Sequence, residues 1–188
     1  MLKIKDLTKI YKDKEVFRNF CIEFKKNTTT CIMAPSGAGK TTLLRLIAGL
    51  EKADFVSFEG FDSETVSMVF QEDRLCENLS PVKNILLVAP TLSETFICEK
   101  LTELEITDYS KPVSQLSGGM KRRVAILRAL LADSTLILMD EPFKGLDAAL
   151  KEKTISFVKK MSASKTLIIA THDVSEVNAL EAELITFK

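Results

Sequence analysis

The sequence has no long apolar run and no excess of either charge. No segment approaches the roughly 20 apolar residues that a membrane-spanning helix needs, and residues 1–6 alternate lysine with apolar residues instead of forming a signal peptide. The 188 residues include 26 Lys and Arg and 26 Asp and Glu, so the formal net charge is zero. This balance disfavours a strongly basic nucleic-acid-binding protein. We therefore expect a cytoplasmic protein with no nucleic-acid partner, in which any membrane function depends on another chain.

Cysteine is too sparse for a metal or disulfide framework. Cys21, Cys31, Cys76 and Cys98 are widely spaced and no two of them form a C-x-x-C pair. A zinc site or a set of disulfides is therefore not expected, and reduced thiols fit a cytoplasmic protein. Cys31 lies in an apolar run, where we expect it to act as a small buried hydrophobic residue.

The apolar residues, 46% of the chain, predict a mixture of strands and helices. They alternate with polar residues in 2–5 and 20–25, which is typical of strands in an antiparallel sheet. Buried strands are predicted at 28–34, 68–70, 136–139 and 166–170, and a last strand at 183–187. Apolar residues recur at helical spacing after the strand at 28–34 (Leu43, Ile47, Leu50) and near residue 100 (Ile97, Leu101, Leu104). Helices are also predicted at 117–131 (Met120, Val124, Leu127, Leu131), 146–161 and 175–180.

Alternation of buried strands with helices favours the α/β class with a mostly parallel core sheet. We expect an N-terminal antiparallel β lobe attached to this sheet and a short α-helical lobe at about 72–116. No linker or repeat interrupts the chain, so a single domain over 1–188 is expected.

Residues 34–42, A-P-S-G-A-G-K-T-T, lie between a predicted strand and a predicted helix, which is the context of a phosphate-binding P-loop. Gly37 and Gly39 let the backbone wrap closely around phosphate oxygens, and the helix start directs its positive end at the same anion. Lys40 is expected to reach the β- and γ-phosphates, and Thr41 to coordinate Mg²⁺. The P-loop pattern begins with glycine, so Ala34 must avoid the left-handed backbone region that glycine tolerates.

Residues 136–142, L-I-L-M-D-E-P, place two carboxylates at the end of an apolar strand. In open α/β folds ligands bind at that edge of the sheet. Asp140 suits the second coordination shell of Mg²⁺, and Glu141 is placed to orient and polarise a water for attack on the γ-phosphate. His172 follows the strand at 166–170. It either hydrogen-bonds the γ-phosphate or the attacking water at the same edge, or serves as an ordinary capping or surface residue.

Residues 116–120, L-S-G-G-M, followed by K-R-R-V-A-I-L-R-A-L-L, resemble the signature motif of the ATP-binding cassette (ABC) family. The resemblance extends from Leu2 to Phe187. It implies an ABC ATPase fold of the P-loop NTPase type, with ATP and Mg²⁺ as cofactors. Compared with the family, the segment 52–67 and the helical lobe are short and the chain stops soon after the last strand, so we expect an active ATPase with few additions.

The resemblance also implies roles for individual residues. Tyr11 matches the aromatic residue that stacks on adenine, although a buried edge tyrosine is the alternative. Gln71 matches the Q-loop residue that contacts Mg²⁺ or water. Asp147 matches an aspartate at the dimer seam, and it also suits the N-cap of the next helix. The remaining nucleotide-binding positions are Ser36, Gly37, Ala38, Gly39, Lys40, Thr41 and Thr42 of the P-loop, and Ser117, Gly118 and Gly119 of the signature, which contact ATP bound by the opposite subunit. Ser117 also suits a helix N-cap.

These matches predict the ATP-hydrolysing subunit of a membrane transporter, peripheral at the inner face of the cell membrane. We expect a homodimer or heterodimer of such subunits, with separate transmembrane permease subunits as partners. Residues 69–75, V-F-Q-E-D-R-L, resemble nitrate-, sulfonate- and taurine-type importers, which favours import. The alternative is an ABC ATPase without a permease, for example of the cofactor-assembly type. A P-loop kinase is disfavoured because it would not carry the signature.

Overall fold

The protein, described by a computed structural model over residues 1–12, 14–61 and 64–187, combines two sheets. The first is antiparallel, with strand order β2–β1–β4. It comprises β1 (Leu2–Tyr11), β2 (Lys14–Phe24) and β4 (Phe55–Glu59). The side chains of Leu2, Ile4, Ile22 and Phe24 are buried. The predicted antiparallel β lobe is therefore confirmed.

The second sheet carries the ends of the functional motifs, and its strand order is β5–β6–β7–β3–β8. Its strands are β3 (Thr29–Met33), β5 (Val66–Val69), β6 (Leu136–Asp140), β7 (Thr166–Ala170) and β8 (Glu183–Thr186). All neighbouring strands are parallel, which confirms the predicted parallel core. Because β7 lies between β3 and β6, the strand that precedes the phosphate loop and the acidic strand are not adjacent.

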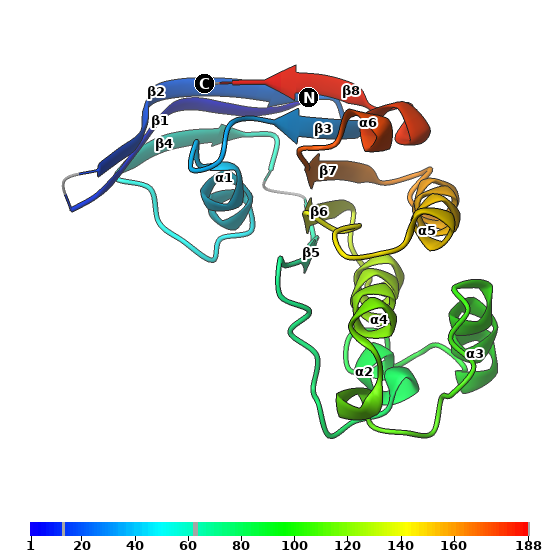
Figure 1. Cartoon of the computed structure of the whole chain (residues 1–188). Coiled ribbons are helices and arrows are strands. Elements are labelled where there is room, and N and C mark those ends of the chain that lie inside the picture. The colour runs from blue at the N-terminus through cyan, green and yellow to red at the C-terminus, as the bar shows by residue number, and fades with distance from the viewer. Residues whose placement is uncertain (13, 62–63, 188) are drawn as a thin grey trace.

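Both faces of the parallel sheet are buried, since alternate residues of each strand join different clusters. Cys31, Ile137 and Ile169 pack toward the helices α4 (Gly118–Leu131), α5 (Ala148–Met161) and α6 (Val174–Leu180). Ile32 and Leu138 pack toward α1 (Lys40–Ile47) and the antiparallel sheet. Figure 1 shows these layers, with α1 and the antiparallel strands on one side of the parallel strands and α5 and α6 on the other. Burial also raises the pKa of the Cys31 thiol to about 12, so this thiol stays neutral, as expected of a core residue.

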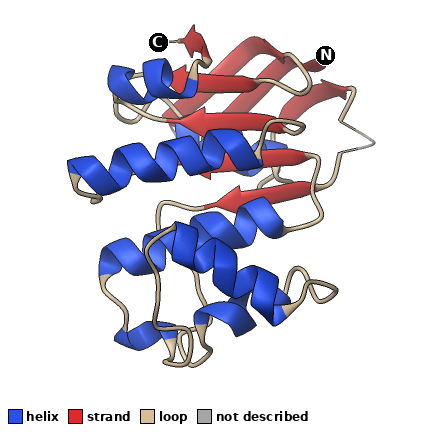
Figure 2. Cartoon of the chain, turned by 90° about the vertical axis from the view of Figure 1, so that its right-hand side faces the viewer, coloured by secondary structure: helices blue, strands red, loops and turns tan. Residues whose placement is uncertain are grey.

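The helices on these faces are α1 (Lys40–Ile47), α4 (Gly118–Leu131), α5 (Ala148–Met161) and α6 (Val174–Leu180). The helical lobe holds α2 (Pro81–Leu86), α3 (Glu94–Glu103) and a 3₁₀ turn at Val113–Gln115. It lies beyond the β5 edge of the sheet (Figure 2). Within the described ranges, no helix combines the length and the apolar character that a membrane span requires.

Two details of the helix predictions are wrong. Leu50 is exposed, because α1 ends at Ile47 and Gly49 (φ 69°) turns the chain away. The predicted stripe on α4 is too narrow: Ile126 and Leu130 are buried, whereas Met120 and Leu131 are only half-buried. This helix is enclosed on several sides, by α2 and α3, by β5 and by α5, so a single amphipathic stripe does not describe it.

Candidate active site

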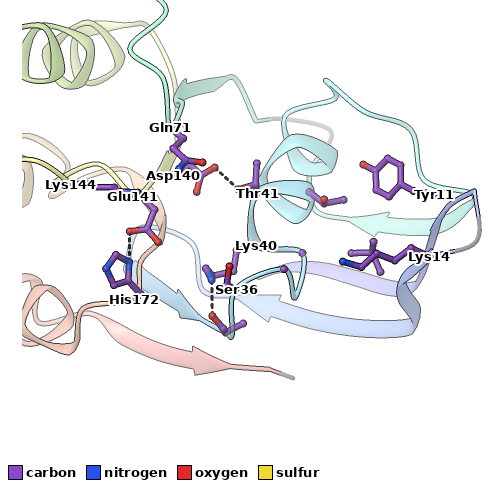
Figure 3. A pocket seen from close by; sticks show the side chains of 15 residues that line it. Tyr11, Lys14, Ser36, Lys40, Thr41, Gln71, Asp140, Glu141, Lys144 and His172 are labelled. Carbon is purple, nitrogen blue, oxygen red and sulfur yellow. Dashed lines mark hydrogen bonds and ion pairs between the residues drawn. The ribbon is translucent and has the colours of Figure 1, made fainter. Parts of the chain in front are cut away.

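A cleft of about 640 Å³ lies where the loop after β3, the ends of β6 and β7, and the β1–β2 hairpin meet. Figure 3 shows side chains from these four segments around the same space. The predicted residues that line it are Tyr11, Ser36, Gly37, Gly39, Lys40, Thr41, Thr42, Gln71, Asp140, Glu141 and His172. Residues more than 100 positions apart in the sequence are therefore gathered at one edge of the parallel sheet, as the motifs predict.

The phosphate loop adopts the backbone that its glycines allow. Gly37 and Gly39 have positive φ angles of 80° and 99°, whereas Ala34 does not enter the positive-φ region. Ala34 thus meets the condition that the missing first glycine imposes. The Lys40 ammonium lies over the loop, where it donates a hydrogen bond of 2.6 Å to the Ala34 carbonyl oxygen. Helix α1 starts at Lys40, so its free N–H groups and its positive end face the loop.

Thr41 and Asp140 form a pair of oxygen donors in the cleft. The Thr41 hydroxyl donates to Asp140 Oδ2 at 2.7 Å. Burial raises the pKa of Asp140, although the hydrogen bond from Thr41 acts in the opposite direction. A hard cation such as Mg²⁺ prefers oxygen ligands, keeps several waters and needs only one or two protein groups. The donor set of this pair therefore fits Mg²⁺ beside a polyphosphate.

Glu141 and His172 contact each other across two neighbouring strands. His172 Nδ1 lies 2.7 Å from Glu141 Oε2 (Figure 3). The parallel pairing of Asp140 with Ala170 places the two strand ends side by side. The His172 side chain is 68% exposed, so its contact with Glu141 leaves the rest of the ring open to the cleft. The structure therefore places His172 where it can act on a ligand.

Arg122 is a residue that sequence reasoning missed. Its guanidinium is buried and donates to the carbonyl oxygens of Asp140, Glu141 and Pro142 at 2.7–3.2 Å. Glu141 has a φ of 50°, a backbone conformation that costs a non-glycine residue about 1–3 kcal/mol. Arg122 holds the carbonyls on both sides of this strained residue. The available signal was the pair of arginines just after L-S-G-G-M, on a helix otherwise rich in apolar residues.

Besides Tyr11, the β1–β2 hairpin contributes two other residues to the cleft. Lys14 and Val16 also line it, and neither was predicted. Tyr11 and Lys14 are directly opposite each other in the hairpin, and Val16 lies on the same face two residues along. Once Tyr11 was placed at the nucleotide, this spacing could have identified both. Lys144 is a third addition, so the lining residues include three lysines as well as the carboxylates of Asp140 and Glu141.

Residues 116–120, which resemble the signature motif, do not line the larger cleft. Gly118 and Gly119 line a second cleft of about 270 Å³ together with Gln71, Lys144 and Arg122. Ser117 caps α4 by accepting a hydrogen bond from Met120 N–H at 3.3 Å. Asp147 caps α5 by accepting one from Leu150 N–H at 3.0 Å. The capping alternatives for both residues are confirmed. Ser117, Asp147 and the loop residue Ala38 do not line the larger cleft.

A glycine loop that aims a helix start at one sheet edge, opposite two carboxylates, is the architecture of P-loop nucleotide-binding proteins. Comparison with known proteins narrows this class. A model of the ABC transporter family matches residues 17–144, and the chain therefore belongs to the ABC transporter family.

Its relatives and structural neighbours agree with this family. The chain is 35% identical to the spermidine/putrescine import ATP-binding protein PotA of Thermotoga maritima over 92% of its own length and 52% of that protein. It is 32% identical to the probable sulfate/thiosulfate import ATP-binding protein CysA of Chlorella vulgaris, over 97% and 85% of the two chains. The ATP-binding cassette MJ0796, solved as a dimer bound to ADP and Pi, matches with a TM-score of 0.87 and 28% identity over 100% of this chain and 94% of the other.

The chain spans about half the length of several curated relatives that it matches. Its fold is that of an ABC ATPase cassette, which confirms the resemblance and the predicted fold class. The more specific likeness of residues 69–75 to nitrate-, sulfonate- and taurine-type importers stays a prediction.

Proposed function

We propose that this chain is the ATP-binding and ATP-hydrolysing subunit of an ABC importer. The observation that carries the proposal is the division of its site between two clefts. The phosphate loop and the carboxylates line one cleft, and Gly118 and Gly119 line the other. Gln71 and Lys144 line both. In this proposal, the start of α4 of a second subunit, with Gly118 and Gly119, encloses a phosphate tail held in the first cleft.

The proposed dimer is therefore head to tail. Each ATP lies between the phosphate loop of one subunit and the Ser117 turn of the other, and Asp147 lies at the seam. The structural neighbour MJ0796, solved as a dimer bound to ADP and Pi, supports the formation of a dimer. The second subunit is either a copy of this chain or a related ABC subunit.

The proposed reaction is in-line attack of water on the γ-phosphate. The loop N–H groups and Lys40 neutralise and position the phosphates, while Thr41 and Asp140 hold Mg²⁺, with Gln71 as a further contact to the ion or to water. Mg²⁺, when bound, offsets the charge of the β- and γ-phosphates. Glu141 orients the attacking water and accepts its proton. His172, held by Glu141, hydrogen-bonds the γ-phosphate or that water.

The transport role rests on the names of the relatives. PotA and CysA are named import ATP-binding proteins. We therefore propose import, with separate permease subunits in the membrane and this subunit peripheral at its inner face.

Glu141→Gln tests the catalytic part of the proposal. The amide keeps the shape but cannot accept the proton, so ATP turnover should fall roughly 10²–10⁴-fold while ATP still binds. Phosphate release measures the turnover, and gel filtration should show an ATP-dependent dimer. Glu183→Gln is the matched control, because Glu183 pairs with Lys25 at the surface. The trapped dimer should also co-purify with a multi-span membrane protein. Normal turnover by a monomeric Glu141→Gln protein would contradict the proposal.

A further inference from the structure

A network of hydrogen bonds holds the turn that carries His172. The buried Thr171 hydroxyl donates to Glu176 Oε2 at 2.5 Å, and Asp173 N–H donates to Thr171 Oγ1 at 3.1 Å. The Asp173 carboxylate in turn caps α6 by accepting from Ser175 N–H at 2.8 Å. These bonds fix the backbone on both sides of His172.

Lys151 connects this turn to α5. Its ammonium lies 2.7 Å from Asp173 Oδ2 and 2.6 Å from Glu176 Oε1, and the carboxylate of Glu176 is buried. Burial lowers the pKa of Lys151, but the two ion pairs outweigh this effect and raise it overall. The hydrogen bond from Lys151 holds the pKa of Asp173 well below its usual range. The Lys151 ammonium and the Asp173 carboxylate are therefore both charged.

The position of Lys151 is locally unfavourable. It lies in the first turn of α5, where its N–H donates to the carbonyl of the N-cap residue Asp147 at 2.8 Å. The positive end of a helix disfavours a cation, and the other lysines of the helix include Lys159 and Lys160 in its last turn, where cations are favoured. Residues in locally unfavourable positions that are stabilised by contacts with another element are typical of functional sites.

We infer that Lys151 is a positioning residue that couples the Asp147 segment to the turn bearing His172. The functional meaning of this coupling rests on the proposed function. Lys151 itself does not line the nucleotide cleft. Its ion pairs join the start of α5, at the proposed subunit seam, to the start of α6. The position of the His172 imidazole relative to the seam is therefore fixed. Assembly of two subunits and orientation of His172 are thereby linked through one ammonium group.

Lys151→Met, Lys151→Arg and Lys153→Met test this inference. Lys153 is on the same helix but is exposed and pairs with Glu105, so Lys153→Met is the matched control. His172 is the only histidine of the chain, and its imidazole resonances are therefore unambiguous in proton NMR spectra. Lys151→Met should shift or broaden them, whereas Lys151→Arg and Lys153→Met should leave them as in the wild type.

The kinetic readout separates positioning from binding. For Lys151→Met we expect kcat of ATP hydrolysis to fall roughly 10- to 100-fold, since a displacement of about 1 Å has effects of this size, with KM for ATP within about twofold. Lys151→Arg should restore kcat. Glu176→Gln keeps an acceptor for Thr171 but loses the charge, and it should shift the same His172 resonances even where Lys151→Met fails to fold.

Unchanged His172 resonances in folded Lys151→Met would overturn the inference, as would a raised KM with an unchanged kcat. Failure of Lys151→Arg to restore kcat would do the same. Absence of ATP hydrolysis by the wild-type protein would instead reject the proposed function, and the NMR comparison would still decide whether Lys151 positions His172.

Discussion

Tyr11 is held by more than its own strand. Its hydroxyl donates to the carboxylate of Glu51, and the Lys9 ammonium lies 4.6 Å from the centre of its ring. Lys9 and Glu51 also form an ion pair at 3.3 Å. Burial and the hydrogen bond to Glu51 raise the pKa of Tyr11, so the phenol stays neutral. The ring is thus fixed at the cleft before any base contacts it.

Tyr11→Ala should weaken ATP binding by about 1–3 kcal/mol, the usual worth of base–aromatic stacking. Tyr11→Phe should weaken it only a few-fold, because the ring remains and only the exposed hydrogen bond to Glu51 is lost. Titration with a fluorescent ATP analogue measures both affinities. Tyr109→Phe is the control, since the only other tyrosine of the chain lies in the helical lobe. Equal losses for Tyr11→Phe and Tyr11→Ala would mean that the hydroxyl, and not stacking, determines affinity.

At the scale of single elements, the phosphate loop depends on close contact with β2. A Cβ atom at Gly39 would lie 2.6 Å from Val16 Cγ1 and 2.7 Å from Phe17 Cζ. Gly39 is also the N-cap of α1 and has a φ of 99°. The loop, the helix start and the hairpin that carries Tyr11 therefore pack as one unit.

Gly39→Ala should destabilise the fold more than Gly49→Ala. Both substitutions introduce the strain of a positive φ, which costs about 1–2 kcal/mol, but a Cβ at Gly49 meets no atom within 4 Å. The clash at Gly39 should add about 1–3 kcal/mol, as overpacking does. Urea unfolding of the two variants gives the difference in free energy of unfolding. Equal losses would show that the loop moves away from β2 at no cost.

At the scale of the whole molecule, the two clefts of one chain suggest a test by mixing. Lys40→Ala and Ser117→Arg should each be inactive, because each damages both sites of a symmetric dimer. In a mixed dimer one site is doubly damaged and the other is intact. Equal mixing should therefore restore about a quarter of the wild-type ATPase activity if subunits pair at random and one site suffices. Phosphate release measures the recovery.

Ser117→Arg also removes a helix cap, which costs about 0.5–2 kcal/mol, so thermal unfolding must show that this variant is folded. Folded variants that stay inactive on mixing would indicate that Ser117 acts within its own chain. The head-to-tail arrangement would then be wrong.

Local sequence signals were sufficient for most of the fold. The strand at 166–170 was predicted with its observed bounds, and β6 extends the predicted run by Asp140 alone. These strands are buried on both faces, so their composition is a strong signal. The same signal is weak for β4, where four of five residues are exposed, and for α4, where burial on several sides hides the helical period.

The motifs identified most of the residues that line the larger cleft. Phosphate binding depends on backbone freedom at Gly37 and Gly39, on a helix start and on a lysine next to it, all of which are contiguous in the chain. The carboxylates at the end of β6 follow from one apolar run and its last residues. Chemistry of this kind is encoded locally, and the sequence by itself was enough to locate it.

How these local pieces meet depends on tertiary packing. Strand order places β7 beside β6, which brings His172 against Glu141. The packing of α4 and α5 brings Arg122 to the strained backbone at Glu141 and Lys151 to Asp173 and Glu176, beside the His172 turn. These contacts join residues from separate elements, and they depend on how buried faces pack rather than on any local pattern. The sequence motifs therefore identify the groups proposed to react, whereas tertiary packing determines which residues hold these groups in place.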